Sequence, residues 1–299
     1  MATDMTDKKD KARVEALLVE LRPALHRYAA RMVGSVLDGE DVVQDAIARA
    51  MAALDRTPPE GDGTAWAFRI AHNAAIDHLR ARARRAGEQE IQEEDMVSDG
   101  DEAARRFAAG AALAVFMHLP PLQRGTVILK DVLGYSNEEA AGILDTTLAA
   151  TKAALHRGRA RLRILADAPA PPPPADPGDV IRLQTYVDRF NARDFDAIRA
   201  MLADDVRFDL VARMTRGRAA FETYFTRYTE MTSWRLSVGM IEGRAAAIVH
   251  DPADPAGPPT GLIVIDWADG RIVRLRDFHH ARYVLRDAAI SLVAGIDAT

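Results

Sequence analysis

The stretch Leu119–Arg163 reads LPPLQRGTVILKDVLGYSNEEAAGILDTTLAATKAALHRGRARLR and predicts a buried helix, a short helix and a basic helix. The short helix begins at Ser136-Asn-Glu-Glu139. There the Ser hydroxyl can accept from the amide of Glu139 while Glu139 reaches back, which is a capping box. A turn follows at Asp145-Thr-Thr147, with a Thr suited to cap the next helix. A capped helix, a tight turn and a helix without acids are typical of a helix-turn-helix DNA reader.

The last helix of this stretch has an apolar side and a basic side. Leu148, Leu155 and Leu162 recur at seven-residue spacing and should face the core. Lys and Arg on the other side would neutralise phosphates while the helix reads base edges in the major groove. An amphipathic surface helix without DNA is the alternative. The residues that we expect to contact DNA are Thr147, Ala150, Thr151, Lys152, His156, Arg157 and Arg159.

These motifs resemble region four of the extracytoplasmic-function (ECF) branch of the sigma-70 family. An LPPxQR opening, a G-(Y/W)-S-x-E-E-A-A helix and a V-K-x-x-L-x-R-A-R-x-x-L helix recur there. The resemblance implies recognition of the minus-35 promoter element. This chain departs at Asp145, where the family usually has Gly. Asp tolerates left-handed backbone angles better than most residues, so we expect the turn to survive.

The segment 12–86 is predicted to be helical and resembles region two of the same family. Asp38-Gly-Glu-Asp-Val-Val-Gln-Asp45 places acids in the first turn of a helix, where the positive end of the helix dipole favours them. The family's equivalent helix docks on RNA polymerase. An acidic, solvated helix face is the alternative. The resemblance implies docking through Asp38, Glu40, Asp41, Gln44 and Asp45.

A second helix of this segment, Trp66–Arg82, resembles the family's I-A-R-N-x-x-I-D helix, which engages and melts the minus-10 element. The usual Arg before Asn is His72 here, so one fixed charge is absent. The preceding loop, Asp55–Thr64, could hold a flipped-out base. The residues that the resemblance assigns to minus-10 contact are Arg69, His72, Asn73, Asp77 and Arg80.

Beyond a Pro-rich spacer, APAPPPPADPGD, the chain changes character. A helix is followed by alternating runs such as WRLSVGMIEG and GLIVIDWADG, which predict a curved antiparallel sheet. This part resembles the SnoaL-like family, an α+β cone shared with nuclear transport factor two. The resemblance implies a pocket, and a small-molecule ligand is left open. Its candidate lining residues are Asp209, Trp234, His250, Asp277 and His279.

The residues of this cone do not favour catalysis or metal binding. Asp277 and His279 alternate along a predicted strand, so they share a face that hydrogen bonding alone can explain. His279 and the adjacent His280 should point to opposite faces, which makes a shared metal unfavourable. We therefore expect no enzyme activity, no cofactor and no metal.

Composition limits the location and the kind of partner. The 299 residues contain no Cys and carry a net charge of −5, yet residues 146–166 hold five Lys or Arg and no acid. A locally basic face on an acidic chain suggests site-specific DNA contact. No apolar run reaches eighteen residues and the N-terminus lacks an apolar signal segment, so we expect a cytoplasmic protein without membrane insertion.

The predicted fold is multidomain: two all-α DNA-binding domains and a C-terminal α+β cone. The expected boundaries are 12–86 for region two, 87–106 for an acidic linker, 107–166 for region four, 167–178 for the Pro-rich linker and 179–290 for the SnoaL-like domain.

The sequence thus predicts an ECF sigma factor that directs core RNA polymerase to promoter DNA, with the SnoaL-like domain modulating it in cis. A helix-turn-helix regulator with a ligand-sensing cone is the alternative, and an enzyme with a DNA-binding tail is a third. The region-two resemblance discriminates, because a repressor has no use for docking and melting helices.

Overall fold

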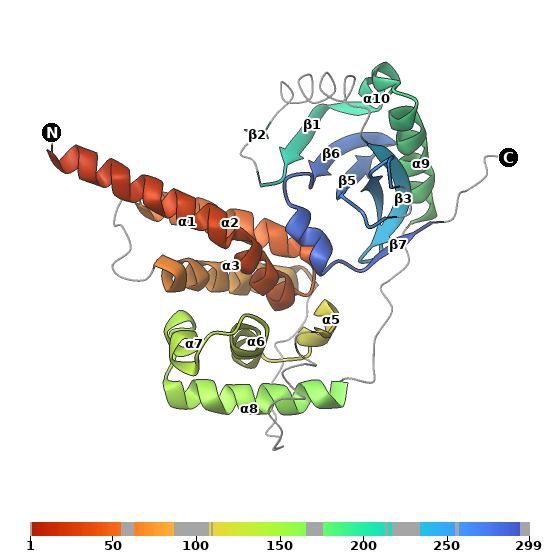
Figure 1. The fold of residues 1–299 in the computed structure, drawn as a ribbon. Helices are drawn as coiled ribbons and strands as arrows, with labels where there is room; N and C mark the ends of the chain where they lie inside the picture. The colour runs from red at the N-terminus through yellow and green to blue at the C-terminus, as the bar shows by residue number, and fades with distance from the viewer. Residues whose placement is uncertain are drawn as a thin grey trace. The chain divides into compact units, whose positions relative to one another are not determined.

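The chain folds into two compact units, Met1–Ala170 and Pro171–Thr299 (Figure 1). The computed structural model describes residues 2–54, 63–86, 108, 110–165, 176–212, 215–216, 234–254 and 257–293. The acidic linker, most of the 55–64 loop and most of the Pro-rich linker therefore lie outside the described residues.

Three long helices open the first unit: α1 (Ala2–Val33), α2 (Val36–Leu54) and α3 (Gly63–Ala86). They lie side by side and pack on one another (Figure 1). Gly34 has a positive φ of 78° and ends α1, and Ser35 accepts a hydrogen bond from the amide of Asp38 at 3.1 Å. The turn between α1 and α2 is therefore short because Gly permits left-handed backbone and Ser caps the next helix.

The second half of this unit contains α5 (Leu113–Phe116), α6 (Pro121–Val127), a π-helical turn η1 (Ile128–Val132), α7 (Asn137–Ile143) and α8 (Leu148–Leu165). The predicted capping box is confirmed: Ser136 Oγ accepts from the Glu139 amide at 3.1 Å, and Glu139 accepts from the Ser136 amide at 2.6 Å. Asp145 has a φ of 51°, as expected for the turn. Thr147 caps α8 through the amide of Ala150 at 3.1 Å.

The two helical regions share one apolar core. Tyr28 and Phe68 from the first region and Phe116, Ile128 and Leu155 from the second belong to the same buried cluster. The ring of Phe68 lies edge-on to that of Tyr135, with centroids 5.3 Å apart. Regions two and four thus form one compact unit here, and the exact domain boundaries stay a prediction.

The second unit is the expected α+β fold. Its sheet has the order β2-β1-β6-β5-β4-β3-β7, and every neighbouring pair is antiparallel except β1 and β6, which are parallel. The prediction of a curved antiparallel sheet was therefore wrong at that pair. The elements are α9 (Pro177–Asn191), α10 (Phe195–Ala200), β1 (Leu202–Leu210), β2 (Thr215–Arg216), β3 (Arg235–Ile241), β4 (Arg244–His250), β5 (Gly261–Ala268), β6 (Arg271–Asp277), η2 (Arg282–Arg286) and β7 (Ile290–Leu292).

Helix α9 covers one face of this sheet, which we call the inner face (Figure 1). Tyr186 and Phe190 of α9 share a buried cluster with sheet residues such as Leu236, Ile263 and Leu275. Because side chains alternate along a strand, the residues between these point to the opposite, outer face.

Substituting Gly39 should destabilise the first unit. A Cβ at Gly39 in α2 would lie 2.6 Å from the Cα of Ala30 in α1, so Gly39→Ala should cost about 1–3 kcal/mol through overpacking. Urea unfolding followed by circular dichroism measures the change. Gly142→Ala in α7 is the matched control, because a Cβ there meets nothing within 4 Å. It should be neutral or stabilise by up to about 1 kcal/mol. Equal changes in the free energy of unfolding for the two variants would contradict the close approach of α1 and α2.

Candidate nucleic-acid interface

The exposed side of α8 is narrower than predicted. Lys152 and His156 are exposed on it, and so are the small residues Ala149, about one turn before Lys152, and Ala153, next to Lys152. The prediction named Ala150 but missed these two Ala residues, although their helical spacing from Lys152 and His156 would have revealed them. An exposed Ala can contact a thymine methyl group. Thr147, where the helix begins, is also exposed.

Two expected contacts on α8 face inward, so the prediction that they project toward DNA was wrong. Thr151 is fully buried and its hydroxyl donates to the Thr147 carbonyl at 3.0 Å. Arg159 has 12% of its side chain exposed and pairs with the buried carboxylate of Asp131. Arg157 and Ala150 are half-buried. The seven-residue Leu pattern locates the core side of α8 but not the width of that side.

On α3, the expected minus-10 residues Arg69, Asn73, Asp77 and Arg80 are exposed. Arg69 donates to the Gly142 carbonyl at 2.8 Å, which connects α3 to the helix-turn-helix. Asp77 accepts from Arg49 of α2 at 2.7 Å, and Arg49 also contacts Asp45 at 2.7 Å. These hydrogen bonds raise the pKa of Arg49, first through Asp77. Exposed pairs of this kind contribute little to stability.

His72 lies at the contact between the two helical regions. Its Nδ1 shares a hydrogen bond of 2.8 Å with the Tyr28 hydroxyl. A Cβ at Gly125 of α6 would lie 3.0 Å from that hydroxyl and 3.7 Å from the His72 ring, so Gly lets α6 approach closely. Burial lowers the pKa of His72 to about 4 and raises the pKa of Tyr28. His72 is therefore neutral near pH 7 and half-buried.

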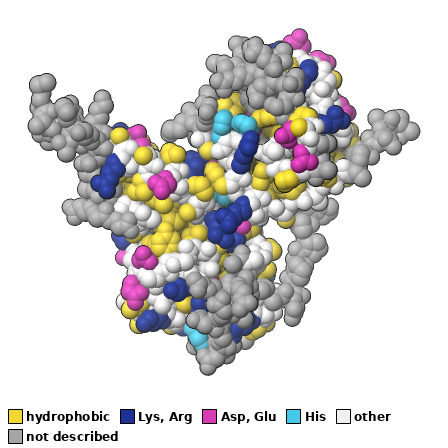
Figure 2. All heavy atoms as spheres, viewed as in Figure 1, with side chains coloured by type: hydrophobic (Ala, Val, Ile, Leu, Met, Phe, Trp, Pro, Cys, Tyr) yellow, Lys and Arg dark blue, Asp and Glu magenta, His cyan; other side chains and the backbone are white. Residues whose placement is uncertain are grey.

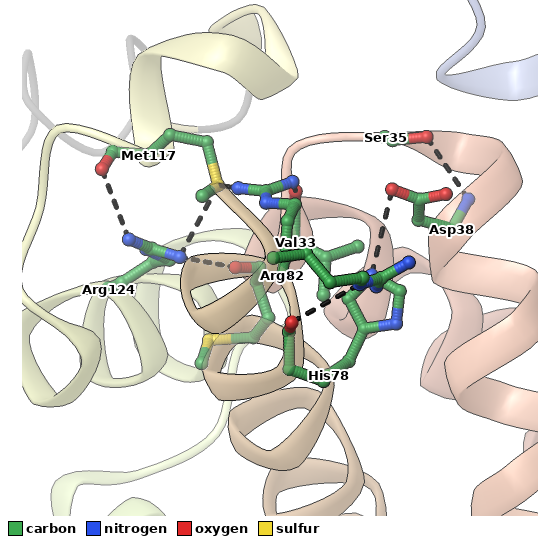
Figure 3. Close-up of polar contacts among 10 residues, drawn as sticks. Val33, Ser35, Asp38, His78, Arg82, Met117 and Arg124 are labelled. Carbon is green, nitrogen blue, oxygen red and sulfur yellow. Dashed lines mark hydrogen bonds and ion pairs between the residues drawn. The ribbon is translucent and has the colours of Figure 1, made fainter. Parts of the chain in front are cut away.

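The start of α2 presents part of the predicted acidic surface. Asp41 and Gln44 are half-buried, and Asp45 is exposed. Asp38 lies 3.7 Å from His78 Nε2 of α3 (Figure 3). Glu40 is 1% exposed and pairs with Arg22 of α1, so its predicted place on the docking surface was wrong. A carboxylate that deep requires a partner, and Arg22 supplies it.

Two arginines bind the carbonyl groups at the end of α1 (Figure 3). Arg124 of the LPPLQR motif is 3% exposed and donates to the carbonyls of Met32, Met117 at 3.1 Å and Leu119 at 2.8 Å. Arg82 of α3 donates to the Val33 carbonyl at 3.0 Å. Burial, with the nearby charge of Arg82, lowers the pKa of Arg124 to about 10, so it stays cationic near pH 7. The last carbonyls of a helix lack partners within it, and these guanidinium groups supply them.

In the second unit, the predicted pocket residues divide between the two faces of the sheet. Asp277 pairs in register with Ile263, whose side chain is on the inner face, and Trp234 also joins the inner cluster. Asp209 and His250 occupy outer positions. Asp209 bonds to Arg274 at 2.9 Å, and His250 bonds to Ser237 at 2.7 Å. The five residues therefore do not form one site, which corrects the prediction.

Tyr186 of α9 was not predicted to belong with Asp277. Its hydroxyl is fully buried and has no hydrogen-bond partner among the described residues. Burial raises its pKa, and the charge of Asp277 raises it further. Aromatic residues at helical spacing usually indicate a core, so the sequence offered no signal for this pairing.

The two adjacent histidines were expected on a strand but lie beyond it. Strand β6 ends at Asp277, and the residues 279–280 form a turn. His279 donates its amide to Asp277 at 2.8 Å, and its ring lies 4.6 Å from Trp234 and 4.8 Å from His280, between centroids. Figure 2 shows histidine side chains together at the surface of this unit. The two rings therefore do not point to opposite faces of a strand, and that prediction was wrong.

The described part of the chain contains neither a candidate membrane span nor a cluster of metal-ligating side chains. None of its helices is both long and apolar enough to cross a membrane. Within the same residues, no group of three or more His, Asp or Glu side chains is arranged to hold a metal ion.

The chain matches three protein families in order. Sigma-70 region 2 matches residues 17–85, sigma-70 region 4 matches residues 110–162, and the SnoaL-like domain matches residues 183–275. Two helical regions ending in a helix-turn-helix, followed by an α+β domain, define a DNA-binding regulator of transcription with an appended third domain.

Relatives narrow this class. The chain is 27% identical to the ECF RNA polymerase sigma factor SigG of Mycobacterium tuberculosis, over 84% of this chain and 77% of that protein. It is 32% identical to the RNA polymerase sigma-E factor of Streptomyces coelicolor, over 47% of this chain and 78% of that protein. A crystal structure of the M. tuberculosis sigma factor SigJ aligns with 21% identity and a TM-score of 0.35, over 88% and 95% of the two chains.

The chain belongs to the ECF RNA polymerase sigma factors of the sigma-70 family and carries a C-terminal SnoaL-like domain. It is a non-enzymatic protein that acts in transcription initiation. Membership excludes the ordinary helix-turn-helix regulator and the enzyme with a DNA-binding tail.

The half-buried His72 should make the first unit sensitive to acid. Its pKa is about 4 in the folded chain against 6.5 unperturbed, so the unfolded state binds more protons below pH 6.5. The contribution of neutral His72 to the free energy of unfolding is fully present above pH 6.5 and is lost as the pH falls toward 4. From pH 7 to pH 5 the loss due to His72 should be about 2 kcal/mol. Urea unfolding of the wild type and of His72→Gln at both pH values isolates this loss. If the free energy of unfolding changes equally with pH in both proteins, groups other than His72 cause the loss.

Proposed function

We propose that α8 reads the minus-35 element and α3 the minus-10 element when the protein is bound to core RNA polymerase. The observation that carries this is the exposed row of Lys152 and His156 on α8, behind a capped α7 and a tight turn. The short side chains of Ala149 and Ala153, next to cationic or hydrogen-bonding ones, allow a helix to enter the major groove closely. The proposed minus-35 set is therefore Thr147, Ala149, Lys152, Ala153, His156 and Arg157.

The proposed docking surface for polymerase is the solvent side of α2, formed by Asp38, Asp41, Gln44 and Asp45. Its acids suit a basic partner. Glu40 supports this surface from inside through Arg22. Arg49 links Asp45 of this surface to Asp77 of the proposed minus-10 helix.

Promoter binding requires the two helical regions to separate. The minus-35 and minus-10 elements lie about 25 base pairs apart, which is about 85 Å of duplex. The longest helix of the compact unit, α1 with 32 residues, is only about 48 Å long. In the compact unit Arg69 and His72 of α3 also contact or approach the helix-turn-helix region. We therefore propose that the compact unit is inactive and that it opens on polymerase.

We further propose that the SnoaL-like domain modulates this opening in cis. The similarity to SigG extends over 84% of the chain and so includes most of this domain. The domain has its own core and its own compact unit, and the Pro-rich linker keeps it at high local concentration near the first unit. A small-molecule ligand of the cone would shift the same equilibrium between the compact and the open form of the first unit.

Removing the exposed side chains of α8 tests the promoter assignment. In run-off transcription with core polymerase on a genomic library, His156→Ala should change which minus-35 sequences are used. Lys152→Ala should weaken binding to all promoters by a similar factor. It should also lower the salt dependence of binding by about one phosphate contact. Arg199→Ala in the second unit removes the same charge and is the control. Unchanged promoter choice in His156→Ala would show that another face reads DNA.

Truncation tests the cis role. A chain ending at Asp167 retains the first unit and should differ from the full chain in promoter-dependent transcription with core polymerase. A full-length protein with a protease site in the Pro-rich linker gives a matched control, because one preparation can be assayed before and after cleavage. Identical transcription by truncated, cleaved and intact proteins under all conditions tested would exclude cis modulation.

A further inference from the structure

The recognition helix is fixed to region four by a buried ion pair. Arg159 of α8 donates to both carboxylate oxygens of Asp131, from Nε at 2.8 Å and from Nη2 at 2.6 Å. The Asp131 side chain is fully buried, and 12% of the Arg159 side chain is exposed. Two parallel bonds between planar groups fix direction as well as distance, which a single Lys–carboxylate contact does not.

Both partners stand at positions suited to setting the rotation of α8. At 100° per residue, Arg159 lies about 40° from the core residue Leu155 and about 60° from the exposed His156. It therefore occupies the border between the buried side and the exposed row.

Asp131 lies in the π-helical turn η1, where the Leu133 amide bonds to the Ile128 carbonyl at 3.0 Å. Such turns are rare and occur mostly as single insertions, often at functional sites.

We propose that Asp131 is a positioning residue for minus-35 recognition, which acts through Arg159 to set the angle at which α8 presents Lys152 and His156 to the major groove. This inference rests on the proposed function of α8. On this inference Arg159 does not contact DNA, and specificity for the minus-35 sequence depends in part on a carboxylate, that of Asp131, which does not contact DNA either.

The alternative, a direct phosphate contact by Arg159, conflicts with the geometry. A phosphate contact by Arg159 would have to break both of its bonds to the buried Asp131 carboxylate, which is strongly unfavourable. Lys152, which is exposed on the same helix, is better placed to bind phosphate.

The test compares the affinity of holoenzyme for a promoter with that for the same promoter carrying one substituted minus-35 base pair. Asp131→Asn and Arg159→Lys should each lower this ratio of affinities about tenfold, the value of one well-placed base contact. The double variant should lower it no further, because the two residues act as one unit. A folding defect lowers the active fraction of holoenzyme equally for both promoters and leaves the ratio unchanged.

Matched controls make the outcomes distinct. Asp145→Asn removes an exposed carboxylate and Arg161→Lys makes the same basic exchange on α8, and both should keep the wild-type ratio. If Arg159→Lys lowers the ratio but Asp131→Asn does not, Arg159 contacts DNA directly and the proposal is wrong. His156→Ala is the arm that tests α8 as the reader: an unchanged ratio there overturns the proposed function, and this inference with it.

Discussion

The buried guanidinium of Arg124 is the contact on which the first unit depends. It donates to the carbonyl of Met32 near the end of α1 and to the carbonyls of Met117 and Leu119, which follow α5. An apolar residue there would leave buried acceptors unsatisfied. Because Arg124 comes from region four and Met32 from region two, the same bonds join the two regions and place the turn from which α2 begins.

This junction determines what α3 can do in the compact unit. Arg69 is bonded to the helix-turn-helix and His72 is neutral beside Tyr28, so two of the five expected minus-10 residues are engaged at this junction. Opening the unit would expose these groups together with the carbonyls that Arg124 satisfies. Polymerase and promoter must therefore replace these contacts. The balance between the compact and the open form of the first unit is what the SnoaL-like domain would modulate.

The misassigned residues share one physical cause. Glu40, Thr151 and Arg159 are polar residues next to exposed ones in sequence, and each turns inward because a partner satisfies it there. Helical periodicity locates the centre of a face to within about one residue, whereas burial at its border depends on which side chain packs opposite. In the second unit, the same limit separated Asp209 and His250 from Asp277, because strand register decides the face.

The sequence by itself determined the order of the regions, the capped helix at Ser136, the left-handed turn at Asp145 and the family, because caps, turns and motifs involve residues within a few positions of one another. Only the tertiary structure decided that Arg159 pairs with Asp131, 28 residues away, and that Arg124 reaches Met32, 92 residues away. It also placed near Asp277 the hydroxyl of Tyr186, which has no hydrogen-bond partner among the described residues. Such contacts follow from how elements pack, and no local pattern encodes the partner of a buried charge.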